Sequence, residues 1–184
     1  MNSYSYLIVI LPPKEVIKTM DKYRRLYAKY TSYTIPSHIT VYPPFFLKGI
    51  TERRFLTKLV NDFSKTKCGE VTLNSIDYFK GRNNVAFVKP DSKSSKYIIN
   101  LLVKTVKFLE GYTKSVYSEY SPTPDKFNPH MTIAEKIPNN SLPKIKKELK
   151  NFNNVFSFKV ESIFVFKKAT DAKSWGMLRE ITFY

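Results

Sequence analysis

The two histidines of this 184-residue chain occur in the same short pattern. His38 stands in "IPSHITVYPPF" (35–45) and His130 in "FNPHMTIAEKI" (127–137), and each is followed two places later by a threonine, Thr40 or Thr132. Side chains alternate between the two faces of a β-strand, so residues i and i+2 point the same way. Each segment is therefore predicted to present an imidazole and a hydroxyl side by side.

Two imidazoles and two hydroxyls that meet at one point suit in-line transfer at a phosphodiester. A neutral histidine accepts the proton of the attacking hydroxyl or water, and an imidazolium protonates the leaving oxygen. The threonine hydroxyls donate hydrogen bonds to the non-bridging oxygens, where charge accumulates. The pattern predicts a phosphodiesterase that needs no metal and no cofactor, with His38, Thr40, His130 and Thr132 as its catalytic residues.

Two other interpretations of the histidines remain open. The first is a metal site, but zinc usually takes three or four protein ligands, and the chain offers a single cysteine, Cys68, and no carboxylate cluster. The second is that the two pairs are unrelated polar residues on separate strands. The duplicated pattern favours the catalytic interpretation over both.

A nucleotide substrate requires aromatic faces on which a base can stack. Strand alternation predicts Tyr42 beside Thr40, which makes it the first candidate. Phe45 lies just beyond two prolines, Trp175 lies in the last predicted hairpin, and Tyr6 lies on the first strand. Each of the four is also compatible with an ordinary place in the core or at its rim.

Hydrophobic periodicity predicts alternating strands and helices along the chain. We expect strands over 3–11, 35–41, 70–79, 84–89 and 129–135, helices over 13–30 and 92–110, and a final long hairpin formed by 152–168 and 174–184. Thr51 and Ser141 are predicted to cap two further helices, and Gly111 to end one. Pro43 and Pro44 are predicted to close the first histidine strand, because proline cannot continue a hydrogen-bonded ladder.

Both halves of the chain show the order histidine strand, helix, strand, turn, strand. The helix begins 13 residues after the first histidine and 11 after the second, and the last strand begins 46 and 44 residues after them. This order predicts one domain with two lobes, roughly 1–90 and 91–184, that are related by a pseudo-two-fold axis and share a cleft.

The formal net charge of +16 is large for a chain of this size, and six of the 31 basic residues are arginine. Such a charge attracts nucleotides or RNA, although a lysine-rich composition is also typical of an AT-rich genome. Arg82, Lys136 and Arg179 are candidates for binding a second phosphate, with a solvated surface as the alternative for each.

The cysteine content and the hydropathy indicate a cytoplasmic protein. One cysteine excludes an internal disulfide and suits a reducing compartment. The apolar run at 6–11 is too short for the core of a signal peptide and lacks basic residues before it. No segment is long enough to cross a bilayer, so we expect no membrane partner.

With these motifs the chain resembles the 2H phosphoesterase superfamily, which includes the LigT-like 2′-5′ RNA ligases and cyclic phosphodiesterases. That family is defined by two His-x-Thr/Ser motifs about half a chain apart. The resemblance implies an α+β bilobal fold, with two pseudo-symmetric lobes whose antiparallel sheets line a central cleft and whose helices lie outside. It also implies that His38, Thr40, His130 and Thr132 are catalytic. Ser37 separates Pro36 from His38, whereas a bacterial branch has proline directly before the motif.

The function that we expect is cleavage of a 2′-5′ phosphodiester, of the 2′-5′ oligoadenylate or 2′,3′-cyclic GMP-AMP type, or of a 2′,3′-cyclic nucleotide phosphate. The expected partner is a nucleotide or oligonucleotide with such a linkage, bound by a monomer. RNA-end processing or 2′-5′ RNA ligation is one alternative. A catalytically silent RNA-binding module is another, although two intact proton carriers argue against it.

Overall fold

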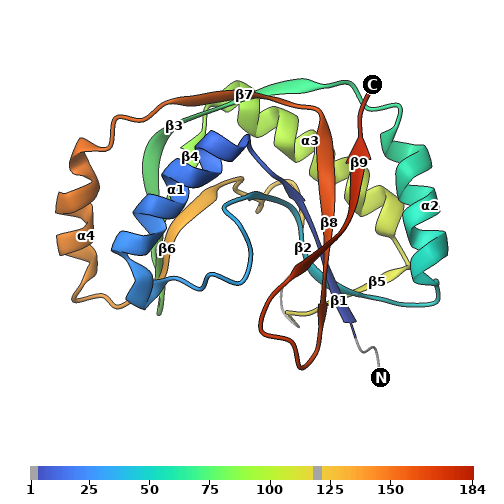
Figure 1. Cartoon of the computed structure of the whole chain (residues 1–184), viewed down its shortest axis with the longest axis horizontal. Helices are drawn as coiled ribbons and strands as arrows, with labels where there is room; N and C mark the ends of the chain where they lie inside the picture. The colour runs from blue at the N-terminus through green and yellow to red at the C-terminus, as the bar shows by residue number, and fades with distance from the viewer. Residues whose placement is uncertain (1–3, 118–121) are drawn as a thin grey trace.

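Two antiparallel sheets, each carrying one His-x-Thr segment, form the framework of the computed structural model, which describes residues 4–117 and 122–184 (Figure 1). The five-stranded sheet has the order β5-β2-β1-β8-β9, and the four-stranded sheet has the order β6-β4-β3-β7. The strands are β1 (Tyr4–Ile10), β2 (Ile39–Leu47), β3 (Gly69–Phe79), β4 (Asn84–Pro90), β5 (Thr113–Ser115), β6 (Met131–Ile137), β7 (Phe156–Val160), β8 (Ser162–Ala169) and β9 (Gly176–Thr182).

Four α-helices and two short 3₁₀ turns are found in the described residues. They are α1 (Lys14–Leu26), α2 (Glu52–Phe63), α3 (Ser92–Leu109) and α4 (Leu142–Glu148), with 3₁₀ turns at Ala28–Tyr30 and Leu149–Asn151. Thr51 caps α2 as predicted, because its hydroxyl accepts from the backbone N–H of Arg54. Gly111 follows α3 with a positive φ, a conformation that glycine adopts without strain. Ser141 occupies the N-cap position of α4 as predicted, but its hydroxyl donates to Asn140 and makes no capping bond.

The predicted division into lobes of residues 1–90 and 91–184 does not match the sheets. The β3–β4 hairpin of the first half pairs with β6 of the second half, and β8 and β9 of the second half pair onto β1 of the first. The predicted hairpin of 152–168 and 174–184 is also divided. The chain leaves the four-stranded sheet at Val160 and enters the five-stranded sheet at Ser162. Each sheet is thus built from both halves of the chain.

Helices α1 and α3 also pack against strands that lie far from them in the sequence. Helix α1 precedes the first histidine strand but packs on β6, whereas α3 packs on β2 of the five-stranded sheet and on β3 and β4 of the four-stranded sheet. In Figure 1, α1 and α4 lie at the end of the molecule with the four-stranded sheet, and α2 lies beside the five-stranded sheet. These contacts across the two sheets help to fix the position of one histidine strand relative to the other.

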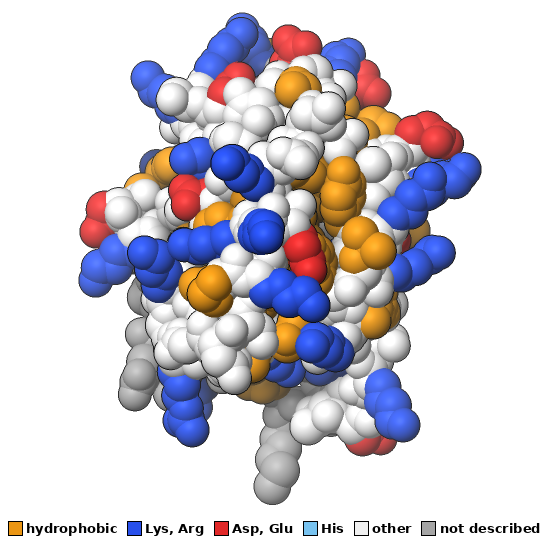
Figure 2. Space-filling model, turned by 90° about the vertical axis from the view of Figure 1, so that its left-hand side faces the viewer, with side chains coloured by type: hydrophobic (Ala, Val, Ile, Leu, Met, Phe, Trp, Pro, Cys, Tyr) orange, Lys and Arg blue, Asp and Glu red, His pale blue; other side chains and the backbone are white. Residues whose placement is uncertain are grey.

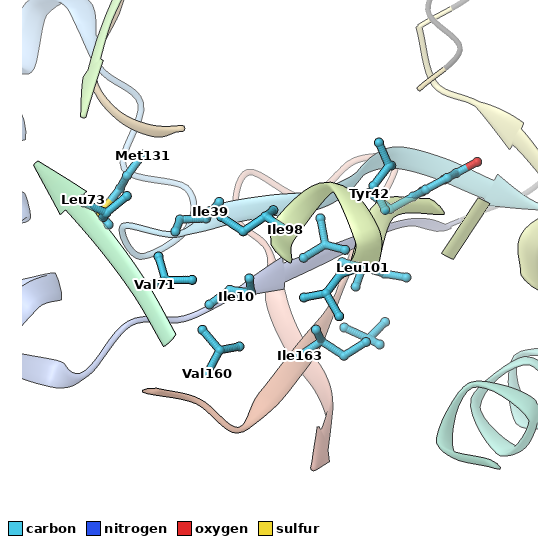
Figure 3. Packing of buried hydrophobic residues seen from close by; sticks show 14 of the residues in the cluster. Ile10, Ile39, Tyr42, Val71, Leu73, Ile98, Leu101, Met131, Val160 and Ile163 are labelled. Carbon is cyan, nitrogen blue, oxygen red and sulfur yellow. The ribbon is translucent and has the colours of Figure 1, made fainter. Parts of the chain in front are cut away.

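The main core lies on the side of both sheets that α3 covers. Figure 3 shows Ile98 and Leu101 of α3 on one side of Ile10 and Ile39 of the five-stranded sheet, with Val71 of the four-stranded sheet on the other side, and all five belong to one core. Both residues that follow the histidines, Ile39 and Met131, are completely buried there, as alternation predicts. The α+β fold with two pseudo-symmetric lobes is therefore confirmed.

Strand β2 does not end at its two prolines but continues to Leu47. Its ladder partners on β1 are Tyr42 with Ile8 and then Phe45 with Tyr6, so both prolines fall inside an irregularity of the register. A residue in such a bulge needs no ladder N–H, and proline is tolerated there. Our expectation of a strand end at Pro43 was wrong for this reason.

Candidate active site

The two histidine strands share an irregularity of register directly after each threonine. Thr40 and Tyr42 lie opposite Val9 and Ile8, so β2 advances two residues while β1 advances one. The same count holds where Thr132 and Ala134 lie opposite Phe87 and Ala86. A second irregularity follows in both strands, up to the pairs Phe45–Tyr6 and Ile137–Asn84. The pseudo-two-fold relation thus extends to the details of the backbone, residue by residue from 40–45 to 132–137.

Both imidazoles are held by the same hydrogen bond. Nδ1 of His38 lies 2.7 Å from the carbonyl oxygen of Pro36, and Nδ1 of His130 lies 2.8 Å from that of Asn128. A carbonyl oxygen only accepts, so each Nδ1 carries the proton and each Nε2 is an unprotonated acceptor in the neutral ring. The backbone two residues upstream therefore sets both tautomers in the same way.

Burial lowers the pKa of both histidines. The pKa of His38 falls from 6.5 to about 4, chiefly because surrounding protein disfavours the charged ring, with additional contributions from the charges of Arg24 and His130. The bonds to the carbonyls of Pro36 and Asn128 oppose this shift in the two rings, and burial also lowers the pKa of His130. Without a ligand, both rings are neutral near pH 7.

The four residues of the motifs line one cleft of about 670 Å³. This volume is typical of small-molecule sites. No hydrogen bond engages the hydroxyl of Thr40 or Thr132 within residues 4–117 and 122–184, so both are available to a ligand. The cleft is lined by Ser5, Leu7, Arg24, Thr31, Ser32, Thr34, Ile35, His38, Thr40, Pro44, Val116, Tyr117, His130, Thr132, Glu135, Lys136, Lys168 and Trp175.

Arg24 of α1 organises the loop that leads to His38. This arginine is 5% exposed, and its guanidinium pairs with Asp21 at 2.9 Å and donates to the carbonyls of Ser32 and Ile35 and to the hydroxyl of Ser37. The Ser37 hydroxyl in turn donates to Asp21. The hydrogen bonds of this network lie within α1 or join α1 to the loop between α1 and β2. Arg24 therefore fixes the backbone that positions His38.

The same loop makes hydrogen bonds to the elements on both sides of it. The Thr31 hydroxyl donates to the carbonyl of Ile133, and both the N–H and the hydroxyl of Ser32 donate to Glu135 on β6. On the other side, the backbone N–H of Trp175 donates to the carbonyl of Thr34. The loop before His38 therefore bridges the two sheets across the cleft.

His130 has apolar neighbours instead of a charged network. Its ring lies 4.9 Å from the ring of Phe79, edge to face, and 5.0 Å from that of Phe87, and the two phenylalanines contact each other at 4.3 Å between centroids. Aromatic contacts of this kind hold a ring in place without hydrogen bonds. The two histidines are thus positioned by different means.

Of the four aromatic candidates for substrate binding, Trp175 lines the cleft and the other three do not. Tyr42 and Phe45 are buried in the main core, and Figure 3 shows Tyr42 on the side of α3. The bulge after Thr40 shifts the alternation by one residue, so Tyr42 faces away from Thr40. The predicted position of Tyr42 in the cleft was wrong for this reason.

Tyr6 also lies in the core, where its hydroxyl donates to Glu52 at 2.7 Å. The residues of β1 that face the cleft are Ser5 and Leu7. Neither Tyr6 nor Phe45 is therefore placed to stack on a base in the cleft.

The three candidate cations are dispersed. Lys136 lines the cleft, Arg179 lies in a separate pocket between α2 and β9, and Arg82 is exposed in the turn between β3 and β4. Figure 2 shows many lysine and arginine side chains with few carboxylates on the end of the molecule that holds α1 and α4. In the part of the chain that the structure describes, no three His, Cys, Asp or Glu side chains cluster as a metal site would require, and no helix has the length and apolar character to span a membrane.

Several cleft residues were not recognised from the sequence, and Arg24 is the most informative of them. It follows Met20 by four residues and so falls on the apolar stripe of α1, where both side chains are buried. An arginine on a buried stripe is a detectable signal. Glu135, Pro44 and Lys168 carried no such signal, because their place in the cleft depends on the bulges and on the pairing of distant strands.

Comparison with known proteins identifies relatives over nearly the whole chain. A model of the 2′-5′ RNA ligase superfamily matches residues 12–172. Among curated proteins, no sequence matches.

Solved structures share the fold at low sequence identity. TT0787 of Thermus thermophilus is 16% identical with a TM-score of 0.63, and the match covers 97% of each chain. Escherichia coli LigT in complex with 3′-AMP is 12% identical with a TM-score of 0.61 and 98% coverage of each chain. Usb1 of Kluyveromyces marxianus with uridine monophosphate is 10% identical with a TM-score of 0.55, and the match covers 98% of this chain and 99% of that one. At these identities the likeness concerns the fold.

Proposed function

The chain belongs to the 2′-5′ RNA ligase superfamily, and on this premise we propose that it is a phosphodiesterase that uses His38, Thr40, His130 and Thr132 as its catalytic residues. The observation that carries the proposal is the convergence of both motifs on one cleft. Both rings have Nδ1 bonded to backbone, which leaves two Nε2 atoms and two unengaged hydroxyls for a substrate.

The proposed reaction is in-line displacement at phosphorus. Nε2 of neutral His38 takes the proton of the attacking hydroxyl, the oxygen bonds to phosphorus, and the leaving oxygen takes a proton from the His130 imidazolium. The hydroxyls of Thr40 and Thr132 donate to the non-bridging oxygens. We assign the base to His38 because the nearby charge of Arg24 disfavours an imidazolium there.

The low histidine pKa values fit this scheme when the substrate is included. An acid must be protonated in the complex, yet burial favours the neutral ring. The negative charge of a bound phosphodiester stabilises an imidazolium beside it. Substrate binding thus supplies the negative charge that favours the protonated form of the acid. Without substrate, both imidazoles are neutral.

The proposed substrate carries a 2′-5′ phosphodiester or a 2′,3′-cyclic phosphate. In a 2′-5′ linkage the free 3′-hydroxyl is the nucleophile, and its attack gives a 2′,3′-cyclic phosphate and a free 5′-hydroxyl at the advantage of an intramolecular step. The solved relatives in complex with 3′-AMP, uridine monophosphate and NADP⁺ are nucleotide complexes, which supports a nucleotide ligand here. Trp175 is the aromatic candidate that remains for stacking.

The test is product analysis with a panel of 2′-5′ and 3′-5′ oligoadenylates, 2′,3′-cyclic GMP-AMP and 2′,3′-cyclic mononucleotides in excess EDTA. We expect cleavage of 2′-5′ linkages or opening of 2′,3′-cyclic phosphates, with 3′-5′ isomers cut far more slowly. Activity that is lost in EDTA and restored by Mg²⁺ or Zn²⁺ would contradict the two-histidine mechanism. Binding with every linkage left intact would favour a silent binding module, and joining of RNA ends would favour a ligase.

A further inference from the structure

The two histidine strands carry chemically different residues at one pair of positions that the pseudo-two-fold relates. The shared register equates Pro44 of β2 with Lys136 of β6, because both lie four residues after their threonine, inside the second irregularity. Both residues line the cleft. One wall of the cleft therefore carries a rigid apolar ring where the other carries a flexible cation.

Lys136 occupies its position at a conformational cost. Its φ is positive, and it is the one non-glycine residue with positive φ among residues 4–117 and 122–184. The left-handed conformation is disfavoured for an ordinary side chain, and glycine adopts it freely. A lysine in this conformation at the cleft wall is the kind of outlier that points to a function of its side chain.

The ammonium of Lys136 has no acidic partner among residues 4–117 and 122–184. No ion pair engages it in the described part of the chain, and its neighbour Glu135 is occupied by two hydrogen bonds from Ser32. Arg24, another cation that lines the cleft, is instead held by an ion pair with Asp21 at 2.9 Å. The charge of Lys136 is thus available to an anion in the cleft.

The position of Lys136 along β6 indicates which anion it meets. Four residues of strand separate it from Thr132, up to about 13 Å. The hydroxyl of Thr132 faces the phosphate at the reaction centre, which rests on the proposed function, so an anion at Lys136 is a second group. The opposite wall, with Leu7, Pro44 and Trp175, suits a base, and the ammonium of Lys168 lies there over the Trp175 ring at 5.4 Å.

We infer that Lys136 forms a second phosphate subsite, which selects nucleotides that carry another phosphate on the β6 side of the reaction centre. The ligand class is a nucleoside with two phosphate groups, one between the histidines and one at Lys136. Charge-assisted contacts to phosphate are among the stronger polar interactions in proteins.

The test compares the affinities of matched nucleotides. Calorimetry measures Kd for two pairs of ligands. The first pair is adenosine 2′-monophosphate and adenosine 2′,5′-bisphosphate, and the second is adenosine 3′-monophosphate and adenosine 3′,5′-bisphosphate. The proteins are wild type, Lys136→Gly, Lys136→Asn and Lys136→Arg. Glycine and asparagine both tolerate the positive φ of this position, so these variants should fold with unchanged or higher Tm. Lys18→Gln, an exposed position on α1, is the control for loss of one positive charge.

In wild type we expect the second phosphate to strengthen binding by about tenfold in at least one of the pairs, which is about 1.4 kcal/mol. The ratio of Kd for the monophosphate to Kd for the bisphosphate should fall to near one in Lys136→Gly and Lys136→Asn. It should keep its wild-type value in Lys136→Arg and Lys18→Gln. A wild-type ratio of one, an equal loss for monophosphate and bisphosphate, an equal effect in Lys18→Gln, or no binding of any nucleotide would overturn the subsite.

The outcome is separate from that of the proposed function. If wild type shows the bisphosphate preference but cleaves none of the phosphodiesters in the panel, the catalytic proposal fails and the subsite stands. If it cleaves them but Lys136 has no effect on the ratio, the subsite fails alone.

Discussion

The two histidines share a backbone and differ in what surrounds them. His38 and His130 make the same Nδ1 bond to the carbonyl two residues upstream, and the strands that follow contain the same two irregularities. Behind His38 lies the charged network of Arg24, Asp21 and Ser37, whereas the ring of His130 packs on phenylalanines. The features that orient the reactive nitrogen are the same in both strands, and the residues that surround the two rings differ.

This difference suggests how two similar histidine strands can support opposite proton transfers, one to a general base and one from a general acid. A base must be neutral before the reaction and an acid must be charged. Burial favours the neutral form of both rings, but a fixed cation acts only on the His38 side. The four predictions below test this asymmetry, and they begin with the largest expected effect.

Removal of either imidazole should abolish most of the activity. His38→Ala and His130→Ala are each expected to lower kcat by about 10²–10⁴-fold, the contribution of general acid or base catalysis. The double variant should lose little more than the worse single one, because the two groups act as a unit. Single-turnover kinetics with the best substrate of the panel measures this. Independent, multiplicative losses would show that the two rings do not act in one reaction.

Removal of either threonine hydroxyl should have a smaller and nearly equal effect. Thr40→Ala and Thr132→Ala are each expected to lower kcat by about 10²–10³-fold, the scale for one donor to a developing oxyanion. Thr→Ser at the same positions keeps the hydroxyl and serves as the matched control. Wild-type rates in both alanine variants would assign the threonines a structural role.

The half-buried histidines should make the folded protein sensitive to acid. The folded-state pKa of His38 lies near 4 and its unfolded value near 6.5, so the unfolded chain takes up a proton that the folded chain refuses between these values. Stability is therefore lost as the pH falls from about 6.5 toward 4. The loss attributable to His38 between pH 7 and 5 is about 2 kcal/mol.

Urea unfolding at pH 7 and pH 5 measures this loss. His38→Gln cannot take up the proton, so it should escape most of the loss that wild type shows over this interval, while a lower stability at both pH values alike is compatible with the prediction. The same pH dependence in wild type and His38→Gln would show that His38 does not have a depressed pKa.

The charge of Arg24 should affect His38 and spare His130. Arg24→Gln is expected to raise the pKa of His38, though not to its usual value, because it removes a repulsive charge but not the burial. NMR titration of the two imidazoles measures the shift, with His130 as the internal reference. Arg24→Lys keeps the charge but loses the planar fork of donors, so it separates charge from positioning.

The same variant identifies the base. The pKa of the general base sets the acid limb of the kcat/KM profile. If His38 is the base, Arg24→Gln moves the acid limb upward and leaves the alkaline limb in place. Movement of the alkaline limb would reverse the roles of the two histidines.

Much of the candidate site could be predicted from the sequence because it depends on local geometry. The His-x-Thr spacing brings imidazole and hydroxyl to one face, and the duplicated order of elements predicted the pseudo-two-fold and the cleft. Thr51 and Gly111 likewise act within a few residues of their own position. Such features depend on the chain immediately around them, and the structure agrees with these predictions.

The predictions that were wrong required knowledge of which strands pair. Tyr42 turned to the core because of the bulge opposite β1, and the lobe boundary failed because β8 and β3 join the sheets of the other half. A bulge is a relation between two strands, and strand alternation in a single sequence does not contain it.

The amino-acid sequence thus determined the reactive groups, their tautomer-setting backbone and the family, since each follows from residues close together in the chain. Tertiary structure alone decided what completes the cleft. Arg24 reaches from α1 to the loop before His38, and Ser32 donates to Glu135 from the far half of the chain. Lys136 lines the cleft at an irregularity in the pairing of β6 with β4. Long-range strand pairing, the packing of α1 on β6 and the packing of α3 on both sheets fix these positions, and no local pattern specifies them.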